Sequence, residues 1–262
     1  PGTVRLRPNR PRRAGRLAGM SLLDQIGPVM VGPSSSHTAG ACRLALLARH
    51  VLGVEPRRAR FVLHGSFAKT ARGHGTDLAL VAGLLGYYPD DERIRDSFAH
   101  AAAAGLEYEF TSADLGDIHP NSVRMELAGA PGEEEVTVLG SSLGAGFVKV
   151  WQVNGFDVQV TGAYHTLLAL HTDRPGVIAR VASVVADDDG NIATAFSARQ
   201  RRGGHAMMSV EIDRPLAPYA VTYLTELPYI HWFRTLPAVM AVDAVVDAAA
   251  STTDAPGEGG PA

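Results

Sequence analysis

The residues best suited to chemistry form one short run near the start of the chain, Gly32-Pro33-Ser34-Ser35-Ser36-His37-Thr38-Ala39-Gly40. Pro33 ends any preceding regular structure, and the pattern from 41 to 52 predicts a helix capped by Ser36. The free backbone N–H groups of that helix would face the hydroxyls of the run and bind a carboxylate or a phosphate. His37 adds the one side chain there that titrates near neutral pH. The alternative interpretation is a solvated loop that only caps a helix.

A second run follows a predicted strand at 59–63 and precedes a predicted helix at 77–85. It reads His64-Gly65-Ser66-Phe67-Ala68-Lys69-Thr70-Ala71-Arg72-Gly73-His74-Gly75-Thr76-Asp77. Thr76 is a suitable helix cap, and Gly75 lets the backbone pass close to a ligand. Lys69 and Arg72 place cations beside the same loop. Because His74 stands between two glycines, we expect it to contact a ligand or a partner rather than to pack in a core.

Two weaker motifs lie further along the chain. His119-Pro120-Asn121 leads into a predicted strand at 122–127 and by itself indicates a turn. The glycine-rich run from 141 to 146 lies between two predicted strands, not between a strand and a helix. We therefore predict a hairpin there and not a dinucleotide-binding loop.

The elements that would position these residues divide at about Gly162 into two predicted domains. Residues 20–161 mix glycine-rich loops, helices and strands, and residues 165–239 follow the order βαββαβ. The fold class expected is α/β (α+β), with a ferredoxin-like second domain. One apolar stripe is predicted for the helix at 177–186, formed by Val177, Ile178, Val181, Val184 and Val185.

Composition narrows the possible functions. A net charge of −3 over 262 residues gives no general attraction to nucleic acid or to an anionic membrane, and no apolar run reaches the roughly 20 residues of a bilayer span. A single cysteine, Cys42, excludes a disulfide framework and a metal centre built from several thiolates of this chain. Residues 1–19 carry six arginines without the apolar stretch of a secretory signal, which favours a cytoplasmic protein. They are expected to form a disordered basic tail, with Met20 as a possible natural start and 240–262 as a second disordered tail.

The βαββαβ segment resembles an ACT domain, a small module that commonly binds amino acids between paired copies. The resemblance rests on that order, on the Asp173-Arg174-Pro175-Gly176 turn and on Asn191 at the start of the next strand. It implies self-association and a regulatory ligand site that includes Asp173, Gly176 and Asn191. The alternative is that Pro175 and Gly176 only form a turn.

Taken together, the runs at 32–40, 65–77 and 119–121, followed by the ACT-like segment, resemble the β subunit of iron-sulfur L-serine dehydratases over roughly Met20 to Pro237. This resemblance implies that the first domain shares its fold with the allosteric substrate-binding domain of some phosphoglycerate dehydrogenases. It also implies an α subunit that holds a four-iron four-sulfur (4Fe-4S) cluster.

The resemblance further implies an L-serine ammonia-lyase that forms pyruvate and ammonia. Its substrate would be held at the carboxylate by Ser34, Ser35, Ser36 and Thr38, and His37 would serve as the base or position it. His74, Gly75 and Thr76 would complete the pocket or meet the α subunit, with Lys69 as a secondary candidate.

Two alternatives belong to other functional classes. A non-catalytic sensor would bind serine and report to another enzyme. A phosphate-ester enzyme would use Lys69 and Arg72 at the same helix terminus, but the sequence shows no evident cluster of carboxylates to bind its metal.

Overall fold

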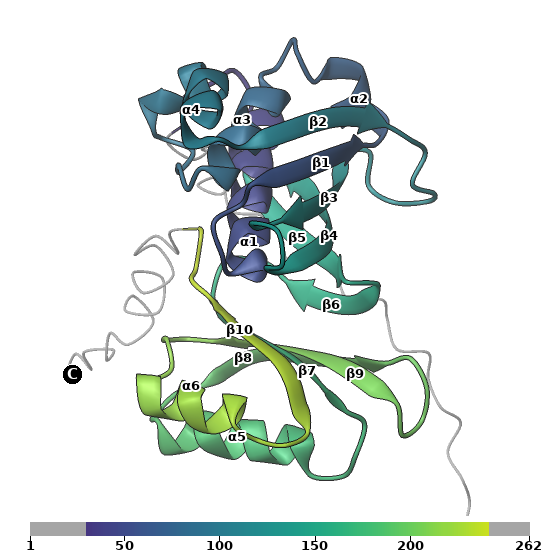
Figure 1. Ribbon diagram of the computed structural model, residues 1–262, viewed down its shortest axis with the longest axis vertical. Coiled ribbons are helices and arrows are strands. Elements are labelled where there is room, and N and C mark those ends of the chain that lie inside the picture. The colour runs from purple at the N-terminus through teal and green to yellow at the C-terminus, as the bar shows by residue number, and fades with distance from the viewer. Residues whose placement is uncertain (1–29, 241–262) are drawn as a thin grey trace, which may run out of the picture.

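The computed structural model describes residues 30–240. The predictions for residues 1–29 and 241–262 lie outside this range. Within it the chain forms a six-stranded sheet and a four-stranded sheet, stacked one above the other in Figure 1. We refer to residues 35–160 as the N-terminal unit and to residues 165–236 as the C-terminal unit.

The sheet of the N-terminal unit has the order β2-β1-β3-β4-β5-β6. Its strands are β1 (Arg58–Leu63), β2 (Glu107–Ser112), β3 (Ser122–Ala128), β4 (Glu135–Gly144), β5 (Phe147–Val153) and β6 (Phe156–Val160). β1 and β2 run parallel and the other neighbours are antiparallel. A parallel pair requires a crossover, and here it contains α2 (Gly65–Thr70), α3 (Thr76–Leu84), the 3-10 helix η3 (Glu92–Asp96) and α4 (Ser97–Ala104). The predicted hairpin is confirmed, because β4 and β5 are joined by Ala145 and Gly146.

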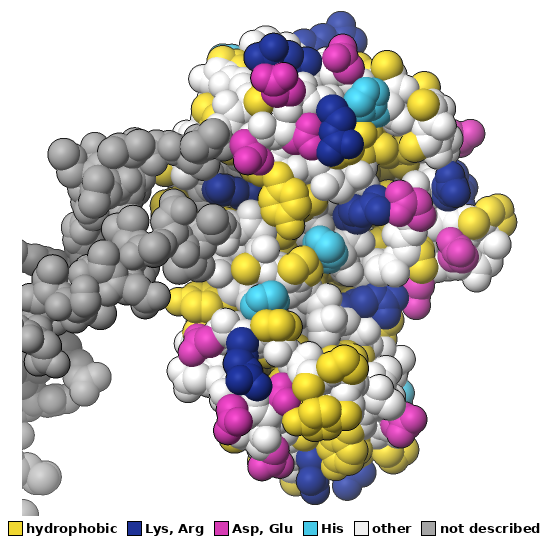
Figure 2. All heavy atoms as spheres, turned by 90° about the vertical axis from the view of Figure 1, so that its left-hand side faces the viewer, with side chains coloured by type: hydrophobic (Ala, Val, Ile, Leu, Met, Phe, Trp, Pro, Cys, Tyr) yellow, Lys and Arg dark blue, Asp and Glu magenta, His cyan; other side chains and the backbone are white. Residues whose placement is uncertain are grey.

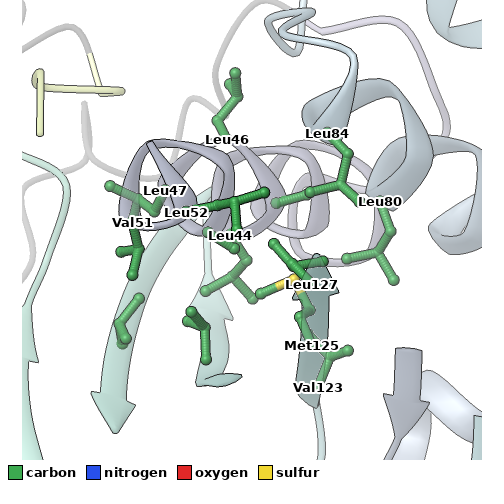
Figure 3. Close-up of a cluster of buried hydrophobic side chains, with 14 of the residues drawn as sticks. Leu44, Leu46, Leu47, Val51, Leu52, Leu80, Leu84, Val123, Met125 and Leu127 are labelled. Atoms are coloured by element: carbon green, nitrogen blue, oxygen red, sulfur yellow. The ribbon is translucent and has the colours of Figure 1, made fainter. Parts of the chain in front are cut away.

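Helix α1 (Ala41–Leu52) has the bounds predicted from its apolar pattern and forms the centre of the core. Figure 3 shows Leu44 of α1 directed toward Met125 and Leu127 of β3, with Leu80 and Leu84 of α3 beside them. A Cβ at Gly83 of α3 would overlap the carbonyl oxygen of Cys42, so this glycine allows the two helices to approach closely. The first turn of α1 is therefore held in place by a tightly packed interior.

The opposite face of this sheet is polar and lies apart from the sequence motifs. Arg60 forms ion pairs with Glu109 (3.0 Å) and Glu126 (3.4 Å) on neighbouring strands. A hollow of about 730 Å³ lies among these side chains. Arg60, which lines the hollow, is paired with glutamates of neighbouring strands. Ion pairs at the surface add little stability, and no function is assigned to the hollow.

The C-terminal unit has the element order predicted from the sequence. Its elements are β7 (His165–Thr172), α5 (Val177–Asp187), β8 (Ile192–Arg199), β9 (His205–Ile212), α6 (Pro218–Thr225) and β10 (Ile230–Leu236). The antiparallel sheet has the order β10-β7-β9-β8, and α5 and α6 cover the face turned away from the N-terminal unit (Figure 1).

The apolar stripe predicted for α5 was wrong at one position. Val177 and Val181 are buried against the sheet, but Ile178 is 55% exposed. Ile178 lies about 100° around the helix from Val177, in the first turn and on the flank of the stripe.

Figure 2 shows apolar side chains gathered on the surface of the C-terminal unit, while charges of both signs are interspersed over the same side of the molecule.

The two units are joined by hydrogen bonds and by a continuous core. β6 is an edge strand, and side chains of β9 accept hydrogen bonds from β6 and from the residue that follows it. Gln159 N–H donates to Ser209 Oγ (3.1 Å), and Thr161 N–H donates to Glu211 Oε1 (2.7 Å). Leu168 and Met207 of the second sheet belong to the core that surrounds α1. In the part of the chain that the structure describes, no helix has the length and apolar character needed to cross a bilayer.

Candidate functional site

The serine-rich run forms a single π-helical turn, η2 (Ser35–Gly40), that continues directly into α1. Ser34 is the cap, since its Oγ accepts from His37 N–H at 3.1 Å. The prediction that Ser36 caps the helix was therefore wrong. The reason is that the π-helical turn adds residues upstream of α1, so the chain enters the helix at Ser34. π-Helical turns are rare and are frequent at functional sites.

The ring of His37 is buried among hydroxyl groups. Its Nδ1 lies 3.3 Å from Ser36 Oγ and 3.4 Å from Ser34 Oγ, and its Nε2 lies 3.1 Å from Ser66 Oγ. Its edge meets the ring of His74 with centroids 4.9 Å apart. His37 is only 9% exposed, whereas Ser34, Ser35 and Ser36 are half-buried and form the outer rim of the cluster.

Burial lowers the pKa of His37 below its ordinary value near 6.5, and the neighbouring His74 lowers it further. The imidazole of His37 is therefore neutral at pH 7. A neutral imidazole can accept a proton, which is the requirement for a general base.

The second run lies against the first, as its candidate role requires. Thr38 is buried, and its hydroxyl donates to the carbonyl oxygen of His74 at 3.0 Å. Gly75 has φ +67°, a conformation that favours glycine, and α3 begins at the next residue. The predicted capping role of Thr76 was wrong, because Thr76 is the first residue of α3 and its buried Oγ1 bonds to no group of the described residues. The side chain of His74 is exposed to solvent.

Lys69, the secondary candidate, is not brought into this cluster. It lies exposed near the end of α2, and no hydrogen bond or ion pair within residues 30–240 connects it to His37. Arg72 is likewise exposed, in the turn that follows.

Sequence reasoning missed Ser66, and it treated the segment around Asn121 as a simple turn. Ser66 N–H donates to the carbonyl oxygen of Pro120 at 2.8 Å, and Ser142 N–H donates to that of Asn121 at 2.9 Å. A Cβ at Gly40 would overlap Ser142 Oγ, so β4 packs tightly against the end of the π-helical turn. One feature of the sequence could have pointed to them: Ser66 lies inside the run at 64–77, and Asn121 lies inside the motif at 119–121.

The three residues expected to form a regulatory site do not meet within one chain. Asp173 and Gly176 lie at the end of β7, where Asp173 accepts from Gly203 N–H (3.0 Å) and pairs with Arg199 (3.2 Å). The hydrogen bond from Gly203 is the main reason that the pKa of Asp173 is lowered. Asn191 lies at the opposite end of the sheet, where its side chain donates to Asp213 at 3.3 Å. A site containing all three residues would need a second copy of the chain.

The residues of this chain do not fit an iron-sulfur cluster. Cys42 is fully buried, its Sγ lies 3.1 Å from the carbonyl oxygen of Tyr87, and burial raises its pKa to about 12. Across residues 30–240 no group of three or more His, Cys, Asp or Glu side chains is placed to hold a metal ion.

We accordingly expect Cys42 to resist alkylation. At pH 8 its thiol is protonated and shielded, so iodoacetamide should leave the native chain unmodified and should modify it in denaturant. Intact mass spectrometry measures both reactions. Rapid labelling of the native chain would contradict the buried position.

A comparison with known protein families matches the part of the chain that contains the two glycine-flanked runs. Residues 22–109 match the family described as serine dehydratase beta chain. The chain is 45% identical over 197 residues to an L-serine dehydratase, beta chain, from Peptoniphilus asaccharolyticus, covering 75% of this chain and 88% of that one. It is 40% identical over 210 residues to a probable L-serine dehydratase, beta chain, from Bacillus subtilis, covering 80% and 94%.

A different enzyme shares part of this sequence. A D-3-phosphoglycerate dehydrogenase from Synechocystis is 26% identical over 189 residues, which cover 70% of this chain and 33% of the dehydrogenase. The two β-chain relatives are more similar and are matched over most of their length. This chain therefore belongs to the L-serine dehydratase β-chain family.

Proposed function

We propose that this β chain, together with an α subunit, converts L-serine to pyruvate and ammonia as an L-serine ammonia-lyase. The observation that carries the proposal is His37, a neutral and buried imidazole held by hydroxyl groups at the start of α1. The β-chain relatives support the same conclusion, since their names pair a β chain with serine dehydration.

The reaction requires a base and a departing hydroxyl. The base removes the α-proton of serine, the C–O bond at Cβ breaks, and water leaves with 2-aminoacrylate as the product. This enamine tautomerises to an imine, which water hydrolyses to pyruvate and ammonia. The α-proton is weakly acidic and hydroxide is a poor leaving group, so both steps need assistance.

The serine hydroxyls supply the contacts for the substrate carboxylate. Ser34, Ser35 and Ser36 are half-buried at the rim and can donate to it together with backbone N–H groups at the start of the turn. Thr38 does not share this role in binding the carboxylate, because its hydroxyl already donates a hydrogen bond to the carbonyl oxygen of His74. It holds the loop of His74, Gly75 and Thr76 against the turn.

His37 is our candidate for the base. Its pKa is lowered, so it is deprotonated at neutral pH, and its hydrogen bond to Ser66 fixes the orientation of the ring. His74 is adjacent and exposed, which places it between His37 and the solvent or partner.

We further propose that a 4Fe-4S cluster in the α subunit supplies the Lewis acid for the substrate hydroxyl. Because the residues of this chain do not fit a cluster, its ligands would come from the partner, and the present chain would bind, orient and deprotonate the substrate. The rim of Ser34, Ser35, Ser36 and His74 would then face the α subunit.

The proposal is tested by mixing this chain with its α subunit under anaerobic conditions and measuring pyruvate. Pyruvate should form only when both chains are present. Turnover by the α subunit alone would contradict a role for this chain in catalysis.

A second candidate function is a serine-sensing regulatory module. It is favoured by the dehydrogenase relative, which contains a region similar to 70% of this chain. The C-terminal unit, which we propose to be an ACT domain, would then pair with a second copy and bind an amino acid near Asp173, Gly176 and the partner copy's counterpart of Asn191. This function predicts serine binding by calorimetry without pyruvate formation in the mixture of both chains.

A further inference from the structure

Asn121 carries a buried hydrogen-bond acceptor that the fold does not use. Its N–H donates to His119 Nδ1 (3.1 Å) and its carbonyl oxygen accepts from Ser142 N–H (2.9 Å), so its backbone is held on both sides. Its side-chain Oδ1 is buried and has no hydrogen-bond partner among residues 30–240. Native proteins leave few buried polar atoms unsatisfied, since each one is destabilising. The side-chain oxygen of Asn121 therefore needs a hydrogen-bond donor that residues 30–240 do not supply.

The position of Asn121 indicates where that donor would lie. The residue that precedes it, Pro120, accepts from Ser66 N–H, and Ser66 Oγ contacts His37 Nε2. On its other side Asn121 is bonded to Ser142, which packs against Gly40 at the end of the π-helical turn. These contacts connect the segment of Asn121 on both sides to the π-helical turn that contains His37.

The substrate has one polar group without an assigned contact. In the proposed function the carboxylate of serine is bound by the hydroxyls at the rim and the serine hydroxyl is bound by the partner's cluster. The α-ammonium group is a donor and needs an acceptor.

A neutral acceptor suits this site better than a carboxylate would. An adjacent carboxylate would stabilise protonated His37 and raise its pKa, so that a smaller fraction of the ring would be free to accept a proton near neutral pH. The causes that lower the pKa of His37 are burial and the neighbouring His74. An amide oxygen can bind the ammonium without adding negative charge beside the imidazole.

We propose that Asn121 Oδ1 accepts a hydrogen bond from the α-ammonium of the bound substrate and thereby selects 2-amino acids over 2-hydroxy acids. The inference rests on the proposed function and adds a specificity-determining residue to that site.

The test uses the complete enzyme, reconstituted from this chain and its α subunit. L-alanine and L-lactate are two inert analogues that differ only in ammonium against hydroxyl, and neither can lose a β-hydroxyl group. Their inhibition constants against L-serine are measured for wild type, Asn121→Leu and Asn121→Asp. Wild type should favour L-alanine, and Asn121→Leu should weaken L-alanine about 10- to 100-fold, as expected for a hydrogen bond to a charged group. Inhibition by L-lactate should change little.

Asn121→Asp is the matched control, because it retains the size and the acceptor. It should keep the preference for L-alanine, and it should shift the acid limb of the pH profile upward through its charge beside His37. Equal weakening of both inhibitors in Asn121→Leu, or an unchanged ratio, would overturn the role of Asn121. If wild type binds L-alanine by calorimetry but forms no pyruvate from serine, the proposed function fails while the ratio of the two affinities still tests Asn121.

Discussion

Replacing His37 with alanine should reduce pyruvate formation by about 10²- to 10⁴-fold, the range associated with loss of a general base. The ring has a lowered pKa, lies within hydrogen-bonding distance of three serine hydroxyls and touches His74. Removing the ring takes away the proton acceptor and the contacts that its two nitrogens make with those hydroxyls. The measurement is initial-rate pyruvate formation by the reconstituted enzyme, with binding of the α subunit checked by co-purification.

The pH dependence provides a second and independent readout of His37. Because its pKa is lowered in the folded chain, the active neutral form persists below pH 6.5, and the rate should fall only as the pH falls through a lower value. The same shift means that acid destabilises the folded chain, since the unfolded imidazole binds a proton at a higher pH. The matched control is His205→Ala in the C-terminal unit, which should retain the wild-type rate and pH profile. Unchanged turnover in His37→Ala would remove His37 from the mechanism.

Replacing Gly65 with alanine should destabilise the chain by about 2–5 kcal/mol and lower its activity. Gly65 has φ +54°, and a Cβ there would lie 2.6 Å from the carbonyl oxygen of Pro120 and 2.8 Å from its Cα. A left-handed conformation costs a non-glycine residue about 1–2 kcal/mol, and overpacking against backbone adds about 1–3 kcal/mol. The strain would displace Ser66, the residue that contacts His37 Nε2. Urea denaturation and pyruvate assays measure the two effects.

Gly105→Ala separates the two causes. Gly105 has φ +68°, but its nearest neighbour is the flexible end of Arg57 at 3.7 Å, so this variant carries only the backbone strain. It should lose about 1–2 kcal/mol and keep its activity. Equal losses in both variants would show that the contact between Gly65 and Pro120 has little effect on stability.

The sequence predicted those features that depend on local patterns. The bounds of α1 follow from its apolar residues, and the βαββαβ order follows from strands and turns of ordinary spacing. The approach of the two glycine-flanked runs was one of the two outcomes that the family resemblance implied, since His74, Gly75 and Thr76 were expected to complete the pocket or to meet the α subunit. The structure brings them together through Thr38 and His74.

Features that depend on tertiary contact could not be predicted in this way. Ser66 meets His37 across 29 residues, and the segment of Asn121 reaches the site through the pairing of β3 with β4. The π-helical turn moved the cap from Ser36 to Ser34, since cap propensity alone cannot show how many residues a turn contains. The exposure of Ile178 depends on which elements cover the flank of α5.

The contact of β6 with β9 has a practical consequence for dissecting this protein. A fragment ending near Thr161 would leave the N–H groups of Gln159 and Thr161 without Ser209 and Glu211, and it would lose Leu168 and Met207 from the core that surrounds α1. Such a fragment would present an unpaired strand edge next to an exposed apolar surface, and this combination promotes aggregation. Work on the serine-rich turn should therefore use both halves of the polypeptide, even where the chemistry is attributed to the first.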